Sequence, residues 1–180
     1  MPPVITIFGS NAPKRGTEAY ERAFALGREL ARAGFTICNG GYGGTMEASA
    51  EGARGVGGEV IGITVEPWGP PNGFVTQSIV HPALVPRLVD LVERGDAYAV
   101  LPGGTGTLLE IALVLEHQFK GTMPPRPLWF LGTQWSPAIR AALTGQSPGA
   151  WVGGTNRLPT FRFFNTPVEI AAAARAQFRG

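Results

Sequence analysis

The sequence predicts an α/β protein with a Rossmann-like, three-layer α/β/α sandwich around a mostly parallel, doubly wound sheet. Two observations lead to this prediction. Short apolar runs rich in β-branched residues recur along the chain, and segments with helical periodicity separate them. Continuous apolar strands alternating with helices are typical of parallel sheets that are covered on both faces. No shift in composition divides the chain, so we expect one domain over residues 1–180.

The first part of the chain predicts three strands and two helices. The runs "VITIF" at 4–8, "FTIC" at 35–38 and "EVIGITV" at 59–65 have the length and composition of buried strands. Residues 17–33 carry apolar side chains at helical spacing and are followed by a glycine, which is a common helix stop. Residues 45–56 are rich in Ala and Glu and also predict a helix.

The middle of the chain begins with residues 66–84, which hold four prolines and two glycines and predict an irregular loop. "LVPRLVDLVERG" at 84–95 predicts a short helix, and "AYAVL" at 97–101 predicts the fourth strand. A helix is expected over 107–119, directly after the glycines at 103, 104 and 106.

The last part of the chain predicts strands "PLWFL" at 127–131 and "FRFF" at 161–164. Thr166 and Pro167 open a final Ala-rich helix, because threonine is a common cap and proline is favoured at the first helical position. Residues 145–156 are expected to form the most mobile loop.

Composition excludes several classes of protein. The net charge is +2 and the basic residues are scattered, so we expect neither nucleic acid nor a membrane surface as a partner. No apolar run approaches the length of a membrane span, and the N-terminus does not resemble a signal peptide. Cys38 is the single cysteine, so there is no disulfide framework and no cysteine metal site. We therefore expect a cytoplasmic protein.

Glycines follow three predicted strands, at the edge where open α/β sheets bind their ligands. A backbone without side chains can approach an anion closely, and the next helix offers unpaired N–H groups. One such turn is commonly only a tight connection, but two in one small domain favour a phosphate site. We predict nucleotide or phosphate contacts from the small residues of these turns: Gly9, Ser10, Gly40, Gly41, Gly43, Gly44, Thr45, Gly103, Gly104, Thr105, Gly106 and Thr107.

A glutamate follows each of the two longer Gly-rich turns. These are Glu47 after "GGYGGT" and Glu110 after "GGTGT". A carboxylate near a helix N-terminus complements the helix dipole, which is the simplest interpretation for either residue. A carboxylate aimed at a phosphate would repel it, so sugar hydroxyls or a reacting water are better partners. We predict that Glu110 faces a sugar attached to the phosphate and that Glu47 supports the nucleotide site.

The sequence "PGGTGTLLE" at 102–110 resembles the PGGxGTxxE signature of the LOG family, the cytokinin-activating phosphoribohydrolases. Weaker matches lie in the expected order at 7–13, 39–53 and 87–104. The resemblance implies hydrolysis of the N-glycosidic bond of a nucleoside 5′-monophosphate, such as AMP or a cytokinin nucleotide. It also implies catalysis without metal or organic cofactor, and assembly into at least a homodimer.

The resemblance assigns catalytic roles to Arg87 and Glu110. Glu110 would stabilise an oxocarbenium-like transition state or position water, and Arg87 would neutralise phosphate or leaving-group charge. The chain departs from the family at three places: Leu88 replaces a lysine, Leu91 replaces a methionine, and "GGTMEA" at 43–48 differs from the family's Gly-rich turn. A non-catalytic carrier of a nucleotide or of the molybdenum cofactor, with the same fold, therefore stays open as the alternative.

Two other activities are excluded by the residues. Members of this family have also been labelled lysine decarboxylases, but a cofactor-dependent decarboxylase needs a Schiff-base lysine. Lys14 and Lys120 are the only lysines, and neither lies in a recognisable site. A dinucleotide-dependent oxidoreductase would have Gly-x-Gly-x-x-Gly after the first strand, where this chain has "GSNAPKRG".

Two further features bear on partners. The loop at 66–84 is where base contacts are expected, with Trp68 and Phe74 as its aromatic residues. The helix at 107–119 is apolar on more than one face, and a second apolar face is costly to leave in water. We therefore predict a homodimer that uses this helix.

Overall fold

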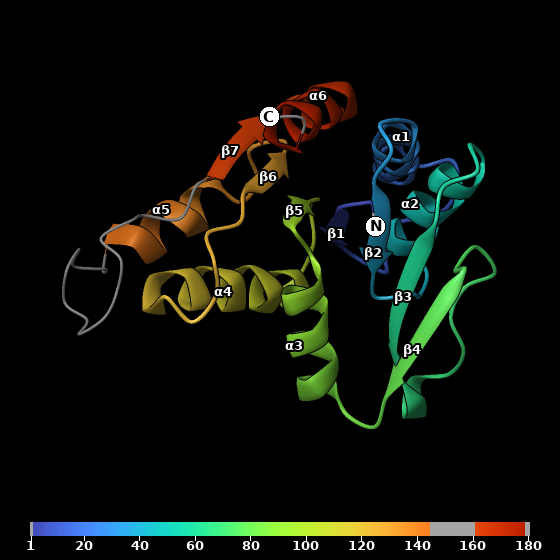
Figure 1. Cartoon of the computed structure of the whole chain (residues 1–180), viewed down its shortest axis with the longest axis horizontal. Coiled ribbons are helices and arrows are strands. Elements are labelled where there is room, and N and C mark those ends of the chain that lie inside the picture. Colours follow the sequence, from blue (N-terminus) through green and yellow to red (C-terminus); the bar gives the residue numbers. More distant parts are fainter. Residues whose placement is uncertain (1, 145–160, 179–180) are drawn as a thin grey trace.

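A seven-stranded parallel sheet runs through the part of the chain that the structure describes, residues 2–144 and 161–178 of a computed structural model. Its strands, in spatial order, are β4 (Gln77–His81), β3 (Val60–Val65), β2 (Thr36–Asn39), β1 (Val4–Phe8), β5 (Ala97–Val100), β6 (Leu128–Leu131) and β7 (Phe161–Phe164) (Figure 1). All six strand pairings are parallel, as the continuous apolar runs predict.

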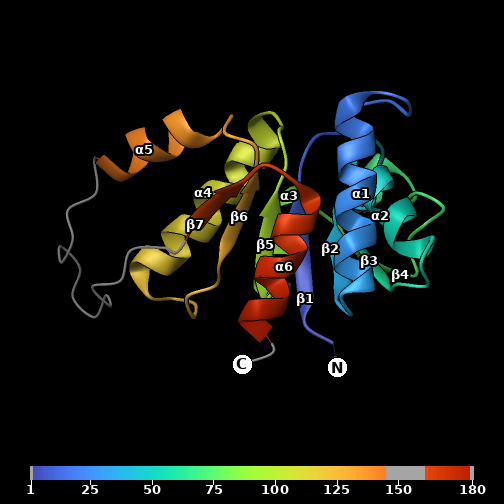
Figure 2. The same ribbon diagram turned by 90° about the horizontal axis from the view of Figure 1, so that it is seen from above.

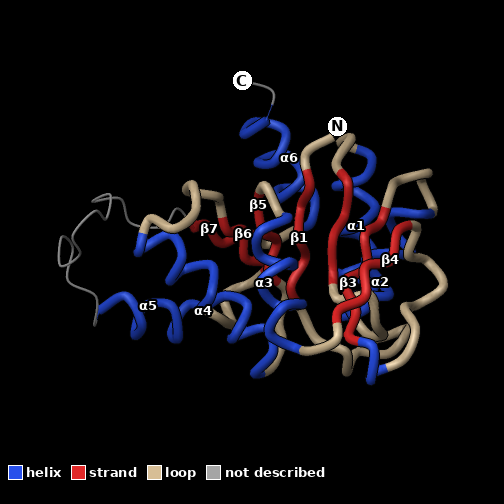
Figure 3. Tube along the Cα trace, turned by 60° about the horizontal axis from the view of Figure 1, so that its bottom comes forward, coloured by secondary structure: helices blue, strands red, loops and turns tan. Residues whose placement is uncertain are grey.

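Helices cover both faces of this sheet. The described helices are α1 (Glu18–Arg32), α2 (Thr45–Arg54), the short 3-10 helix η1 (Glu66–Trp68), α3 (Leu84–Arg94), α4 (Thr105–Lys120), α5 (Ser136–Thr144) and α6 (Pro167–Phe178). Figure 2 views the face covered by α1 and α6, and Figure 3 shows α3 and α4 on the other side of the strands. The predicted three-layer α/β/α sandwich is confirmed.

The core lies in two main layers, because successive side chains of a strand point to opposite faces of the sheet. Ile5 and Ile7 of β1 pack in the layer beneath α1, α2 and α6. Phe8 packs in the opposite layer, with Val92 of α3 and Ile111 of α4. Both layers are apolar, so the sheet is buried on both faces.

The structure contains three elements that the sequence analysis does not predict, β4, η1 and α5, and several predicted boundaries shift by one or two residues. Strand β4 lies inside the segment predicted to be an irregular loop; it is an edge strand with largely exposed side chains and lacks an apolar run. Helix α5 was not predicted, and Ile139 is its one buried side chain. Helix α4 begins at Thr105, two residues before the predicted start. The loop expected at 145–156 lies outside the described residues.

Strand β1 marks the point at which the strand order reverses. It pairs with β2 on one side and β5 on the other, and the chain runs outward from it in both directions. Ligand sites of open α/β sheets lie beyond the carboxyl ends of the strands at such a point. The Gly-rich turns after β1, β2 and β5 meet there.

No helix within residues 2–144 and 161–178 has the length and apolarity needed to cross a membrane.

Helices α1 and α2 approach each other closely through two glycines. A Cβ at Gly27 would collide with the backbone carbonyl of Ser49, and a Cβ at Gly52 would collide with that of Phe24. Contact of this kind leaves no room for a methyl group. The position of α2, and of the turn before it, therefore depends on these glycines.

Gly27→Ala is expected to lower the free energy of unfolding by about 2–3 kcal/mol, because an added methyl group overpacks the contact with α2. Alanine otherwise favours a helix over glycine, so a stabilised variant would contradict the packing. Gly55→Ala is the matched control, since Gly55 has a φ of −60° and the nearest atom lies 3.5 Å from its added Cβ. Urea denaturation of the three proteins measures the difference.

The predicted homodimer rests on the apolar start of α4, where Leu108 is 44% exposed and Leu109 is similarly exposed. Light scattering at micromolar concentration is expected to give the mass of a dimer, and Leu108→Glu is expected to give a monomer, because a charge would be buried in the interface. Val80→Glu, at an exposed position on β4, is the control that should stay dimeric. A monomeric wild type would contradict the prediction.

Candidate functional site

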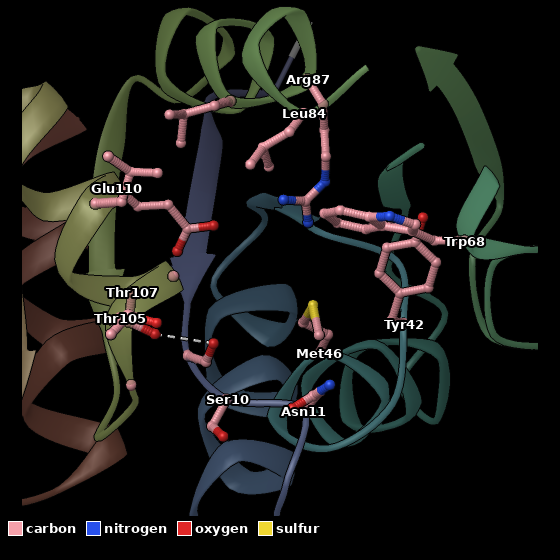
Figure 4. Close-up of a pocket in the computed structure, with 15 residues that line it drawn as sticks. Ser10, Asn11, Tyr42, Met46, Trp68, Leu84, Arg87, Thr105, Thr107 and Glu110 are labelled. Carbon is pink, nitrogen blue, oxygen red and sulfur yellow. Dashed lines mark hydrogen bonds between the residues drawn. The ribbon is translucent and has the colours of Figure 1, made fainter. Parts of the chain in front are cut away.

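A cavity of about 490 Å³ opens at the carboxyl ends of the central strands (Figure 4). Four stretches of chain supply its walls: the turn after β1, the turn between β2 and α2, helix α3, and the start of α4; η1 adds one aromatic residue. The lining residues are Gly9, Ser10, Asn11, Tyr42, Met46, Trp68, Leu84, Arg87, Leu88, Gly104, Thr105, Gly106, Thr107, Leu109 and Glu110.

Arg87 enters the cavity from α3 and is only 6% exposed. Its Nε donates a hydrogen bond of 2.8 Å to the carbonyl oxygen of Ile63 in β3. A Cβ at Gly40 would collide with the guanidinium, so glycine at that position makes room for the arginine. Burial lowers the pKa of Arg87, and the nearby Glu110 carboxylate opposes this shift.

Glu110 reaches the cavity from the second turn of α4 and is 9% exposed. Burial raises the pKa of its carboxyl to about 7, although the charge of Arg87 pulls it down. Figure 4 shows the carboxylate and the guanidinium on facing walls, with no hydrogen bond drawn between them. The structure thus brings together the two residues predicted to be catalytic and leaves space for a ligand between them.

The threonines at the helix starts hold the turn after β1. The hydroxyl of Thr107 donates to the carbonyl oxygen of Gly9 at 3.0 Å, and the hydroxyl of Thr45 donates to that of Ser10, also at 3.0 Å. These protons are used inside the protein. The donors left for an anion are the backbone N–H groups of the first turn of α4, which have no partner within the helix.

The side chains of two asparagines hold the Gly-rich turn between β2 and α2. The N–H of Gly41 donates to Asn39 Oδ1 at 2.8 Å. Asn72 Nδ2 donates to the carbonyl oxygens of Gly41 and Tyr42 at 3.0 and 2.8 Å. These bonds fix the turn and place Tyr42 in the cavity wall.

Seven of the residues predicted to contact a nucleotide do not line this cavity, and their assignment stays a prediction. They are Gly40, Gly41, Gly43, Gly44, Thr45, Glu47 and Gly103. Glu47 lies on the side of α2 where its charge acts on Arg15, which precedes α1, and on Tyr20 of α1. Gly103 packs against the side chain of Thr107. These residues shape the turns around the cavity.

Several lining residues were not predicted as site residues from the sequence: Asn11, Tyr42, Met46, Leu84, Leu88 and Leu109. Trp68 was expected near the base and does line the cavity, whereas Phe74 packs on the apolar core. A signal for Trp68 and Tyr42 exists in the sequence, because both follow the carboxyl ends of strands. Nothing in the local pattern distinguishes them from packing residues.

A model of the SLOG cluster4 family matches residues 2–120, which hold every residue that lines the cavity. The chain belongs to the SLOG cluster4 family. The matched region also contains the "PGGTGTLLE" segment at 102–110 on which the resemblance to the LOG phosphoribohydrolases rests.

Curated relatives of this SLOG protein confirm the LOG resemblance. The chain is 34% identical over 126 residues to the cytokinin riboside 5′-monophosphate phosphoribohydrolase of Rhodococcoides fascians. This match covers 67% of this chain and 63% of that protein. An uncharacterized protein of Archaeoglobus fulgidus is 38% identical over 100 residues, which is 56% of this chain and 66% of the relative. The matches to curated relatives span between about half and two thirds of the relatives' own length.

Solved structures share the fold of this SLOG protein at low identity. The molybdenum cofactor carrier protein of Chlamydomonas reinhardtii superposes with a TM-score of 0.77 at 22% identity, with 100% of both chains covered. The molybdenum cofactor binding protein of Rippkaea orientalis gives 0.73 at 23% identity, with 98% of each chain covered. At these identities the likeness concerns the fold alone.

The raised pKa of Glu110 predicts a stability that depends on pH. The unfolded carboxyl titrates near 4.5 and the folded one near 7, so the folded chain binds the extra proton between these values and loses stability as pH rises through them. Glutamine carries no charge at either pH, so Glu110→Gln removes the cost of burying a carboxylate at pH 8. The substitution is expected to raise the free energy of unfolding by about 3 kcal/mol at pH 8 and to change it little at pH 4.

Urea denaturation at the two pH values measures the effect. Glu116→Gln is the control, because Glu116 is exposed on the same helix and pairs with Lys120 at 3.3 Å. Its effect is expected to stay within about 0.5 kcal/mol at either pH. An equal effect of Glu110→Gln at pH 4 and pH 8 would show that the carboxyl is not protonated in the folded state.

Proposed function

We propose that the chain hydrolyses the N-glycosidic bond of a nucleoside 5′-monophosphate, releasing the free base and ribose 5-phosphate. AMP, or AMP with a modified base such as a cytokinin nucleotide, is the proposed substrate. The observation that carries the proposal is the pair of buried, opposite charges on Arg87 and Glu110, which face each other across one cavity beside the N-terminus of α4. The names of the LOG relatives support the same chemistry.

The start of α4 is the proposed phosphate site. Residues 104–107 line the cavity with unpaired N–H groups and the positive end of the helix dipole. Ser10 lies on the adjacent wall, and its hydroxyl oxygen accepts from the N–H of Ala12 at 3.1 Å. The hydroxyl proton of Ser10 is therefore left to donate to a phosphate oxygen.

The reaction places water on C1′ as the bond from C1′ to the base nitrogen breaks, and its electron pair leaves with the base. The transition state carries positive charge on the sugar, which the carboxylate of Glu110 stabilises from one turn beyond the phosphate site. Glu110 then accepts a proton from the attacking water, for which a pKa of about 7 is suited. Arg87 stabilises the negative charge on the departing base, which takes a proton from solvent water while Glu110 returns its proton to solvent. This proposal needs no metal or organic cofactor.

Wild-type protein is expected to release adenine and ribose 5-phosphate from AMP in equal amounts. Glu110→Gln keeps the shape of the side chain and removes its charge, so turnover is expected to fall about a hundredfold or more. AMP binding should survive or tighten, because a negative charge near the phosphate has gone. Arg87→Ala is expected to lose turnover and also to bind AMP more weakly. Chromatography of the products and calorimetric titration of AMP provide the two measurements.

Glu116→Gln is the control for turnover, since Glu116 lies on α4 outside the cavity. Unchanged turnover in Glu110→Gln would overturn the proposed chemistry. A wild type that binds AMP but releases no base from AMP, GMP, CMP, UMP or an N6-substituted AMP would favour the carrier. Leu88, which takes the place of the family's lysine in the cavity wall, is the observation on the carrier's side.

A further inference from the structure

Trp68 is exposed on the wall of the cavity. Its side chain is 54% exposed, whereas the other aromatic residues of the described segments are buried or half-buried. A large apolar ring left open inside a cavity is typical of a ligand contact, because aromatic side chains supply most of the contact area in small-molecule sites. The roles proposed for the polar residues of the cavity give no reason for an exposed aromatic ring at this position.

The ring of Trp68 is held by a fixed neighbour. It packs against Tyr42 with ring centroids 6.0 Å apart and a tilt of 50°. The hydroxyl of Tyr42 donates to the carbonyl oxygen of Val65 at 3.1 Å and accepts from the N–H of Val65 at 2.7 Å. Because Tyr42 is fixed at both the turn and its hydroxyl, the pair forms a preorganised aromatic wall.

Arg87 lies against the same aromatic wall. Its guanidinium carbon is 5.8 Å from the ring centroids of both Tyr42 and Trp68, within reach of a cation–π interaction. Figure 4 shows these three flat groups together on one side of the cavity, with Thr105, Thr107 and Glu110 on the other. A ligand with its phosphate at α4 and its sugar at Glu110 would extend toward the aromatic wall.

We infer that Tyr42 and Trp68 form the subsite for the base, with a flat aromatic base stacked on Trp68 beside Arg87. The inference rests on the proposed function, because it takes a nucleotide as the ligand, and it adds the residue that selects the base. Trp68 is then a specificity residue: it recognises the leaving group and makes no contact with the phosphate. The cavity distinguishes a nucleoside monophosphate from a sugar phosphate through this ring.

Calorimetric titration of AMP and of ribose 5-phosphate into wild type, Trp68→Ala, Trp68→Leu and Trp68→Phe tests the inference. Trp68→Ala and Trp68→Leu are expected to weaken AMP binding about tenfold or more, the range found when a base-stacking ring is removed. Trp68→Phe is expected to stay within a fewfold of wild type, because it keeps a ring. Binding of ribose 5-phosphate, which has no base, is expected to change less than twofold in all three variants.

Val85→Ala is the matched control, because Val85 is exposed on α3, follows the lining residue Leu84 in the chain, and does not itself line the cavity. Unchanged AMP binding in Trp68→Ala would overturn the inference. Equal losses for AMP and ribose 5-phosphate would also overturn it, since Trp68 would then support binding of the sugar phosphate and not of the base. A wild type that binds neither ligand contradicts both the inference and the proposed function.

Adenine release by the wild type separates the two proposals. Trp68-dependent AMP binding without adenine release would support the base subsite and overturn the catalysis. Adenine release with AMP binding that does not depend on Trp68 would leave the catalysis standing and overturn the base subsite.

Discussion

The candidate site depends on two opposite charges that are buried close together and kept on separate walls. A guanidinium and a carboxylate are both costly to take out of water, and a direct ion pair is the usual compensation. Arg87 instead binds the carbonyl oxygen of Ile63 and lies against two aromatic rings, while burial raises the pKa of Glu110 to about 7. Part of the stability of the fold is given up to keep the space between them open.

Contacts with neighbouring elements fix the positions of α3 and α4, the helices that carry Arg87 and Glu110. Arg126, before β6, donates to the carbonyl oxygens of Glu93 and Gly95 at the end of α3, at 2.6 and 2.7 Å. At the other side of α3, Asp90 bonds to His81 of β4 at 2.9 Å. Helix α4 is tied to the turn after β1 through the Thr107 hydroxyl. The distance between the facing walls is therefore set by contacts with neighbouring elements, as preorganised sites require.

The same fold serves proteins with different roles, which is common among α/β folds. Carriers of the molybdenum cofactor superpose on most of the chain, while the relatives with the higher sequence identity include named phosphoribohydrolases. The proposed hydrolysis depends on Arg87 and Glu110, which line the same cavity as Leu88.

Short-range pattern determined the fold class, the Gly-rich turns and the two catalytic candidates, because strand composition, helix signals and the 102–110 motif are local features. Strand β4 escaped prediction because an edge strand with exposed side chains has no apolar run. The hydroxyls of Thr45 and Thr107 donate to backbone oxygens 35 and 98 residues away in the chain. The tertiary structure alone determines three features: the partners of these hydroxyls, the contact between Trp68 and Arg87, and the raised pKa of Glu110. Each depends on how segments that are distant in the sequence pack together.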